Sequence, residues 1–174
     1  MLFKTTDIIR TVFAMLMKEK SVNKIYVKDV AERCEMSRNT FYYYYKSIDD
    51  LVKEVMNIYV RSCPAEGAPS CAFDCVRPYV EGCLSHKEEI LAFYDSKYRP
   101  MLIEILESLV REKLTDYMRS LVLTGKLEAA KAEVISRSLL RLMMGSVDRW
   151  LFEQMSFDLS EMKEILENFR ASSR

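Results

Sequence analysis

Apolar residues recur at three- and four-residue spacing along most of the chain, which is the period of amphipathic helices. Few turns are available for a many-stranded sheet, because the 174 residues include only four glycines and four prolines. We therefore expect an all-α protein of about nine helices. The pattern predicts these helices over residues 4–20, 27–34, 37–45, 47–61, 71–86, 87–95, 101–123, 127–154 and 160–169.

The stretch from Val27 to Leu51 predicts two short helices joined by a tight turn, followed by the start of a third helix. Ser37 is a good N-cap for the second helix, because its hydroxyl can accept a hydrogen bond from a free backbone N–H in the first turn. That helix carries Phe41 and Tyr45 four residues apart, on one side. We expect this side to face the core, and helix 4–20 to pack beneath the pair and complete a three-helix head.

The opposite side of the same helix carries the informative chemistry. With about 100° per residue, Asn39 and Tyr43 lie almost opposite Phe41, flanked by Thr40 and Tyr42, with Arg38 on the edge, and no carboxylate shares this side. Amides can pair with adenine, guanidinium groups with guanine, and hydroxyls with phosphates. A solvated helix with spare aromatic side chains is the alternative. The four consecutive tyrosines disfavour it, because solvated faces usually carry Lys and Glu.

These residues resemble the DNA-binding head of the TetR/AcrR family of transcriptional regulators. The sequence Val27-Lys28-Asp29-Val30-Ala31 matches the family pattern VxDIAxxAGVS. Further matches to the following pattern, xGTxYxYFxxKxxL, are Ser37, Thr40, Tyr42, Tyr44, Tyr45 and Leu51.

Three residues depart from the pattern. Glu35 stands where Gly is usual, so the turn must use a conformation open to a non-Gly residue. Asn39 replaces a Gly, and Tyr26 replaces a capping Thr, which predicts a weaker cap there.

The resemblance implies a sequence-specific DNA-binding regulator, namely a ligand-released repressor that acts as a homodimer on a palindromic operator. The predicted operator-reading residues are Arg38, Asn39, Thr40, Tyr42 and Tyr43. The predicted phosphate-contacting residues are Lys28, Tyr44 and Lys46. The small-molecule effector, the operator sequence and the target genes are not encoded in any motif.

Charge and composition divide the chain in a consistent way. Residues 1–62 contain 11 Lys and Arg against 8 Asp and Glu, whereas the remainder contains 15 against 18. A mildly basic head on a mildly acidic body fits DNA binding by one end only. The Pro-, Gly- and Ser-rich segment 62–70 predicts a boundary between a DNA-binding domain, residues 1–62, and an effector-binding and dimerisation domain, residues 63–174.

Membrane and export signals are not expected in this sequence. No apolar run approaches the ~18 residues that span a bilayer, and charged residues interrupt the N-terminus early. Five cysteines, without metal-finger spacing, favour free thiols in a reducing compartment. We therefore expect a cytoplasmic protein without a membrane partner.

Two sets of body residues are candidates for effector binding and for dimerisation. Ligand cavities are mostly apolar with a few polar groups, and the polar candidates are Tyr79, Tyr94, Tyr98, Tyr117 and Arg141. In the resembling family the last two helices form a four-helix dimer interface with their two-fold mates. The residues at corresponding positions are Leu139, Leu140, Met143, Met144, Val147, Leu151, Met162, Ile165, Leu166 and Phe169. The alternative is that the band in 139–151 is only intramolecular core.

A cysteine cluster offers an alternative function. Cys71, Cys75, Cys83 and His86 fall along one side of a predicted helix, which would suit a thiol- or metal-responsive regulator. Plain packing is the competing interpretation, because Cys often behaves as a small buried hydrophobe. We expect no metal site, no cofactor and no enzymatic activity, since the chain has one His, no nucleophile elbow and no Gly-rich phosphate loop.

Overall fold

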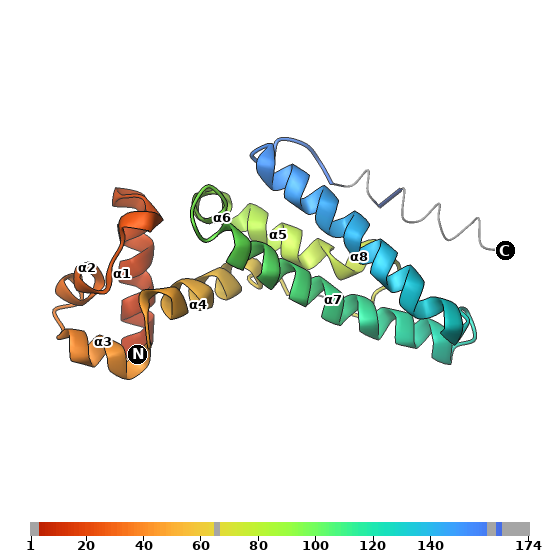
Figure 1. Ribbon diagram of the computed structural model, residues 1–174, viewed down its shortest axis with the longest axis horizontal. Coiled ribbons are helices and arrows are strands. Elements are labelled where there is room, and N and C mark those ends of the chain that lie inside the picture. Colours follow the sequence, from red (N-terminus) through yellow and green to blue (C-terminus); the bar gives the residue numbers. More distant parts are fainter. Residues whose placement is uncertain (1–3, 65–66, 160–162, 165–174) are drawn as a thin grey trace. The chain divides into compact units, whose positions relative to one another are not determined.

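The computed structural model describes residues 4–64, 67–159 and 163–164, and within these residues it contains helices and no strands (Figure 1). This confirms the all-α prediction. The predicted ninth helix, residues 160–169, lies outside the described residues except for Lys163 and Glu164. The eight α-helices are α1 (Thr5–Glu19), α2 (Val27–Arg33), α3 (Arg38–Tyr44), α4 (Ile48–Val60), α5 (Arg77–Ser85), α6 (Lys87–Tyr94), α7 (Arg99–Leu123) and α8 (Ala129–Phe152).

The chain divides into two compact units. The first comprises Met1–Tyr59 together with Glu88–Leu102, and the second comprises Val60–Lys87 together with Ile103–Arg174. The first unit therefore contains α1 to α3, nearly all of α4 and α6, and the first turn of α7.

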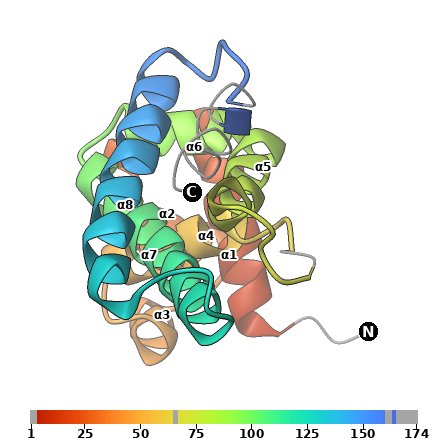
Figure 2. The ribbon, with the colours of Figure 1, turned by 90° about the vertical axis from the view of Figure 1, so that its right-hand side faces the viewer.

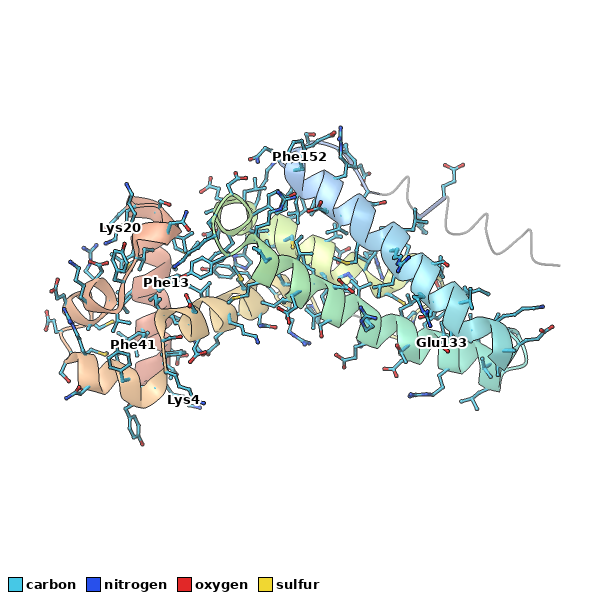
Figure 3. All side chains as sticks on the ribbon, in the orientation of Figure 1. Lys4, Phe13, Lys20, Phe41, Glu133 and Phe152 are labelled. Atoms are coloured by element: carbon cyan, nitrogen blue, oxygen red, sulfur yellow. The ribbon has the colours of Figure 1, made fainter. Side chains whose placement is uncertain are left out.

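The head consists of α1, α2 and α3, with α4 following directly. Helix α1 buries Ile9, Val12, Phe13 and Leu16, as its apolar spacing predicts, whereas Ile8 of the same predicted stripe is exposed. Phe13 and Phe41 are fully buried and fill the middle of the head (Figure 3). The core that supports α3 is therefore formed by large apolar side chains from helices close in sequence.

The starts of α1 and α5 are set by local features of the chain. Helix α1 begins at Thr5 without a side-chain cap; Lys4 is the N-cap, and its backbone N–H donates to Asp7. The predicted helix 71–86 is broken near Pro78, as a proline inside it predicts, into a short 3-10 helix, Ala72–Cys75, and α5. Proline fits the first turn of α5, where its missing N–H would have no partner in any case.

The second unit is built on the long helices α7 and α8, which run antiparallel on either side of the turn at Gly125 (Figures 1 and 2). Gly125 has φ +69°, a left-handed conformation typical of a residue that ends a helix. Leu109, Val110 and Leu114 of α7 and Met143, Val147 and Trp150 of α8 are all buried. The indole N–H of Trp150 donates to the carbonyl of Phe157, which holds the chain after α8 against that helix.

Candidate nucleic-acid interface

The turn between α2 and α3 forms without the usual glycine. Glu35 adopts φ +53°, and the following Met36 N–H donates to the carbonyl of Ala31 at 3.0 Å. A left-handed residue of this kind closes the end of a helix and reverses the chain. The expected conformation open to a non-Gly residue is not found: the turn keeps a left-handed conformation that favours glycine, and Glu35 adopts it.

Helix α3 begins where the sequence predicts. The Ser37 hydroxyl accepts a hydrogen bond from the Thr40 N–H at 3.0 Å, as expected of an N-cap, and it also lies 2.9 Å from the Thr40 hydroxyl. This pair fixes the first turn of α3, so that the residues after Ser37 start from a defined backbone position.

The inward side of α3 is formed by its two predicted aromatic residues. Phe41 is completely buried, and Tyr45, at the C-cap, is 5% exposed. Their rings lie 5.6 Å apart between centroids. This burial fixes the rotation of the helix about its axis.

The outward side of α3 presents the predicted DNA-reading residues to solvent. Arg38, Asn39 and Thr40 are exposed. Tyr43 is 82% exposed, more than any other aromatic residue described in the head, and its ring packs edge-on against Tyr44 at 5.0 Å. The remaining predicted residues, Lys28 of α2 and Tyr42, Tyr44 and Lys46, are exposed as well. The helix thus offers amide, guanidinium and phenol groups with no carboxylate among them.

The start of α2 replaces the missing side-chain cap with a carboxylate. Tyr26 forms no side-chain cap, but its backbone N–H donates to Asp29 Oδ2 at 2.8 Å, and Lys20 Nζ lies 2.9 Å from the same oxygen. Burial alone would raise the pKa of Asp29, yet the hydrogen bonds from Lys20 and from the Tyr26 N–H lower that pKa below its ordinary value. Aspartate at the third helical position is the sequence signal for this arrangement.

One feature of the head was not predicted from the sequence. The Arg10 guanidinium of α1 donates to Asp7 of the same helix and to Glu54 of α4. Apolar periodicity is insensitive to such a pair, because the partners are 44 residues apart and lie at the margin of the buried stripe.

The body candidates are placed as follows. Tyr79, Tyr94, Tyr98 and Tyr117 are buried, whereas Arg141 is exposed on α8 beside Arg137 and Ser138. The Tyr98 hydroxyl is occupied, since it donates to Asp49 Oδ1 at 2.7 Å.

The predicted dimer band lies mostly inside the chain. Leu140, Met143, Met144, Val147 and Leu151 are buried within the second unit, and Leu139 is half-buried. The other predicted dimer residues, Met162, Ile165, Leu166 and Phe169, lie outside the described residues.

The cysteines in the described part of the chain differ in burial, and Cys34 and Cys63 are half-buried. Cys71, Cys75 and Cys83 are buried, and burial raises the pKa of Cys75 and of Cys83 to about 12. Burial therefore disfavours the thiolate, which is the form that nucleophilic reactivity requires. Among the described residues, no three His, Cys, Asp or Glu side chains converge on a metal-sized site.

Helix α2, a tight turn and the capped helix α3, which has one buried and one exposed side, together form the arrangement of a helix-turn-helix DNA-binding protein. Residues 11–55 match the family described as bacterial regulatory proteins, tetR family. The match spans α2, α3 and most of α1 and α4, and it confirms the resemblance seen in the sequence: this head is similar to the DNA-binding domain of tetR-family regulators, which supports a DNA-binding transcriptional regulator. A comparison with curated proteins finds no match.

No helix in the described residues is both long enough and apolar enough to cross a membrane.

Proposed function

We propose that this protein is a homodimeric repressor that binds a palindromic operator through α3 and is released by a small molecule. The observation that carries the proposal is the orientation of α3, with Phe41 and Tyr45 buried and Asn39 and Tyr43 exposed on the opposite side. A helix fixed in rotation in this way presents the same few side chains to every duplex that it meets.

The proposed roles follow from the chemistry of the exposed groups. The Asn39 amide suits an adenine edge and the Arg38 guanidinium suits a guanine edge. Thr40, Tyr42 and Tyr43 supply hydroxyls and rings for base edges and thymine methyl groups. Lys28, Tyr44 and Lys46 flank this surface and suit phosphates, which would set the register on the duplex.

A second copy is proposed to pair through the outward face of α8. Val134, Leu142 and Phe152 are exposed on this helix, at spacings that place them on one side. Gly145 lies on the same side, and apart from the neighbouring residues and backbone of α8 itself, no atom of the described residues comes within 4 Å of the position that a Cβ would occupy there. Another helix could approach closely at this point. A two-fold dimer would present two α3 helices to half-sites about 34 Å apart.

Effector release requires a route from the body to α3, and the corner between α6 and α7 supports one. The Tyr98 hydroxyl binds Asp49 in the first turn of α4, and the Lys97 N–H donates to the Asn23 side chain at 3.1 Å, before α2. A ligand that binds better to a state with α7 in another position would favour that state. The change would reach the helix-turn-helix through the contacts at Asn23, before α2, and at Asp49, after α3.

Binding-site selection from a random duplex library tests the proposal. We expect the protein to enrich a palindrome and to bind it with strong salt dependence. Arg38→Ala should weaken binding of the selected site by about 1–3 kcal/mol and relax the preference at one position. Arg137→Ala, which removes an exposed arginine of α8, is the matched control and should change neither. Failure to enrich any sequence over the starting library would contradict the proposal.

A further inference from the structure

A charged network in the first unit joins α1 to α4 beside the end of α3. Arg10 bridges the carboxylates of Asp7 and Glu54 with its two terminal nitrogens. The Arg10 side chain is 27% exposed, so its interactions are partly shielded from water. One side chain therefore ties together the two helices that flank the helix-turn-helix in the sequence.

The Tyr45 hydroxyl lies at the edge of this network. This oxygen is buried, and it has no hydrogen-bond partner of standard geometry in the described residues. Burial raises the pKa of Tyr45, the Glu54 carboxylate raises it further, and the Arg10 charge lowers it. Both charged groups therefore lie close enough to the hydroxyl to act on it, although neither meets the geometry of a full hydrogen bond with it.

An unpartnered buried hydroxyl is unfavourable by about 1–3 kcal/mol. A small rotation of α3 would move the hydroxyl relative to Arg10 and Glu54. The position of those two groups therefore influences which rotation of α3 is preferred.

We propose that Arg10 is a positioning residue for DNA reading. By binding Asp7 and Glu54 it fixes α1 and α4 around Tyr45, and it thereby sets the rotation at which α3 presents Asn39 and Tyr43 to the bases. This inference rests on the proposed use of α3 to read an operator, and it adds a residue outside α3 that determines the selectivity of that reading.

Direct contact between Arg10 and a phosphate is disfavoured by its surroundings. One guanidinium and two carboxylates leave the network with a net negative charge. Arg10 and Asp7 also line an open groove of about 320 Å³ whose other walls include Val55, Ile58 and Tyr59, a largely apolar surface. A phosphate would meet more repulsion than attraction there.

The test compares two duplexes: a site selected by the wild-type protein from a random library, and the same bases in shuffled order. The variant is Arg10→Met, which keeps most of the side-chain stem and removes the charge. Its matched control is Arg33→Met, because Arg33 forms an exposed ion pair with Glu19 in the same head. Dissociation constants, their salt dependence and thermal unfolding are measured for each protein.

We expect Arg10→Met to weaken binding of the selected site about tenfold and to leave binding of the shuffled duplex unchanged. A tenfold change lies within the range of coupling energies measured between residues of one network. Arg10→Lys should restore part of the selectivity, and Arg33→Met should keep all of it. Glu54→Gln should shift selectivity in the same direction as Arg10→Met, which keeps the test decisive if Arg10→Met does not fold.

Two results would overturn the inference while leaving the proposed function intact. Equal weakening on both duplexes, with a salt slope reduced by about one, would make Arg10 a phosphate contact. An unchanged ratio between the two duplexes in folded Arg10→Met, with only a lower melting temperature, would make the network purely structural. A wild-type protein that selects no site would overturn the proposed function and this inference together.

Discussion

Glu35 is the residue at which the head departs most from relaxed backbone geometry. Its φ of +53° is a left-handed conformation, which is unfavourable for a residue with a Cβ by roughly 1–2 kcal/mol. Glycine would adopt it freely but would lose more entropy on folding. The sequence predicts a conformation open to a non-Gly residue here, because it does not show that the backbone of the turn keeps the left-handed angle with Glu35 in place of glycine.

Glu35→Gly should therefore stabilise the protein, by about 0.5–1 kcal/mol after the entropy loss of glycine is included. Chemical denaturation monitored by circular dichroism measures the change in the free energy of unfolding. The matched control is Glu32→Gly, an exposed position inside α2, where glycine should destabilise by about 1 kcal/mol. A Glu35→Gly protein less stable than wild type would show that the side chain has a role beyond the turn.

Asp29 gives a second residue-scale prediction, with a defined pH dependence. Its pKa is lowered in the folded protein from an ordinary value of 3.8. The stabilisation is therefore complete above pH 3.8 and is lost as the pH falls through the lower folded value.

Asp29→Asn should destabilise the protein by about 1 kcal/mol at pH 7, through loss of the charged partner of Lys20 and the Tyr26 N–H. The difference from wild type should shrink as the pH falls below 3.8. Urea denaturation at several pH values measures it. Asp116→Asn, at an exposed ion pair with Arg119, is the control and should have almost no effect at any pH. A difference that persists in acid would assign the effect to packing.

At the scale of elements, the sequence predicts where helices occur, but it predicts only in part what each buried helix face packs against. Period, caps and breaks lie within short stretches, so α3 after Ser37 and the break at Pro78 were both predictable. The apolar band of α8 was recognised as well, but periodicity gives only the direction of a buried face. Whether Met143 and Val147 pack within the chain or against a second copy depends on the neighbouring helices, which the pattern does not specify.

Ser37→Ala tests whether the cap of α3 matters for DNA reading as well as for stability. Loss of the hydrogen bond to the Thr40 N–H should destabilise the head by about 1 kcal/mol and weaken binding of the selected DNA site. Ser47→Ala, which removes the corresponding bond to Asp50 in α4, is the matched control. It should lower stability by a similar amount with a smaller loss of DNA binding. Equal losses of binding would indicate that the cap acts only through overall stability.

At the scale of the whole molecule, membership of the units could not be read from sequence order. Glu88–Leu102 belongs to the same compact unit as the head although it follows the Pro-, Gly- and Ser-rich segment. The hydrogen bond from Tyr98 to Asp49 spans 49 residues and involves a polar tip on an otherwise buried ring. A long-range polar contact of this kind has no periodic pattern in the sequence. The sequence therefore does not distinguish a Tyr98 that bonds to Asp49 from a Tyr98 that lines a ligand cavity.

The proposed two-fold pairing leads to the last prediction. If the outward face of α8 contacts a second copy, Leu142→Asp should convert the dimer into a monomer, because an uncompensated carboxylate would be buried in the interface. Sedimentation velocity measures the mass. Leu142 is 40% exposed in the single chain, so the substitution should leave its helical circular dichroism intact.

The matched control is Leu123→Asp, at an 80% exposed leucine that ends α7, and it should remain dimeric. The monomer should bind a single half-site as the wild type does, yet lose most of its affinity for the full palindrome, because linking two heads raises the effective concentration of the second. A Leu142→Asp protein that stays dimeric and keeps its palindrome affinity would place the two-fold contact elsewhere on the body.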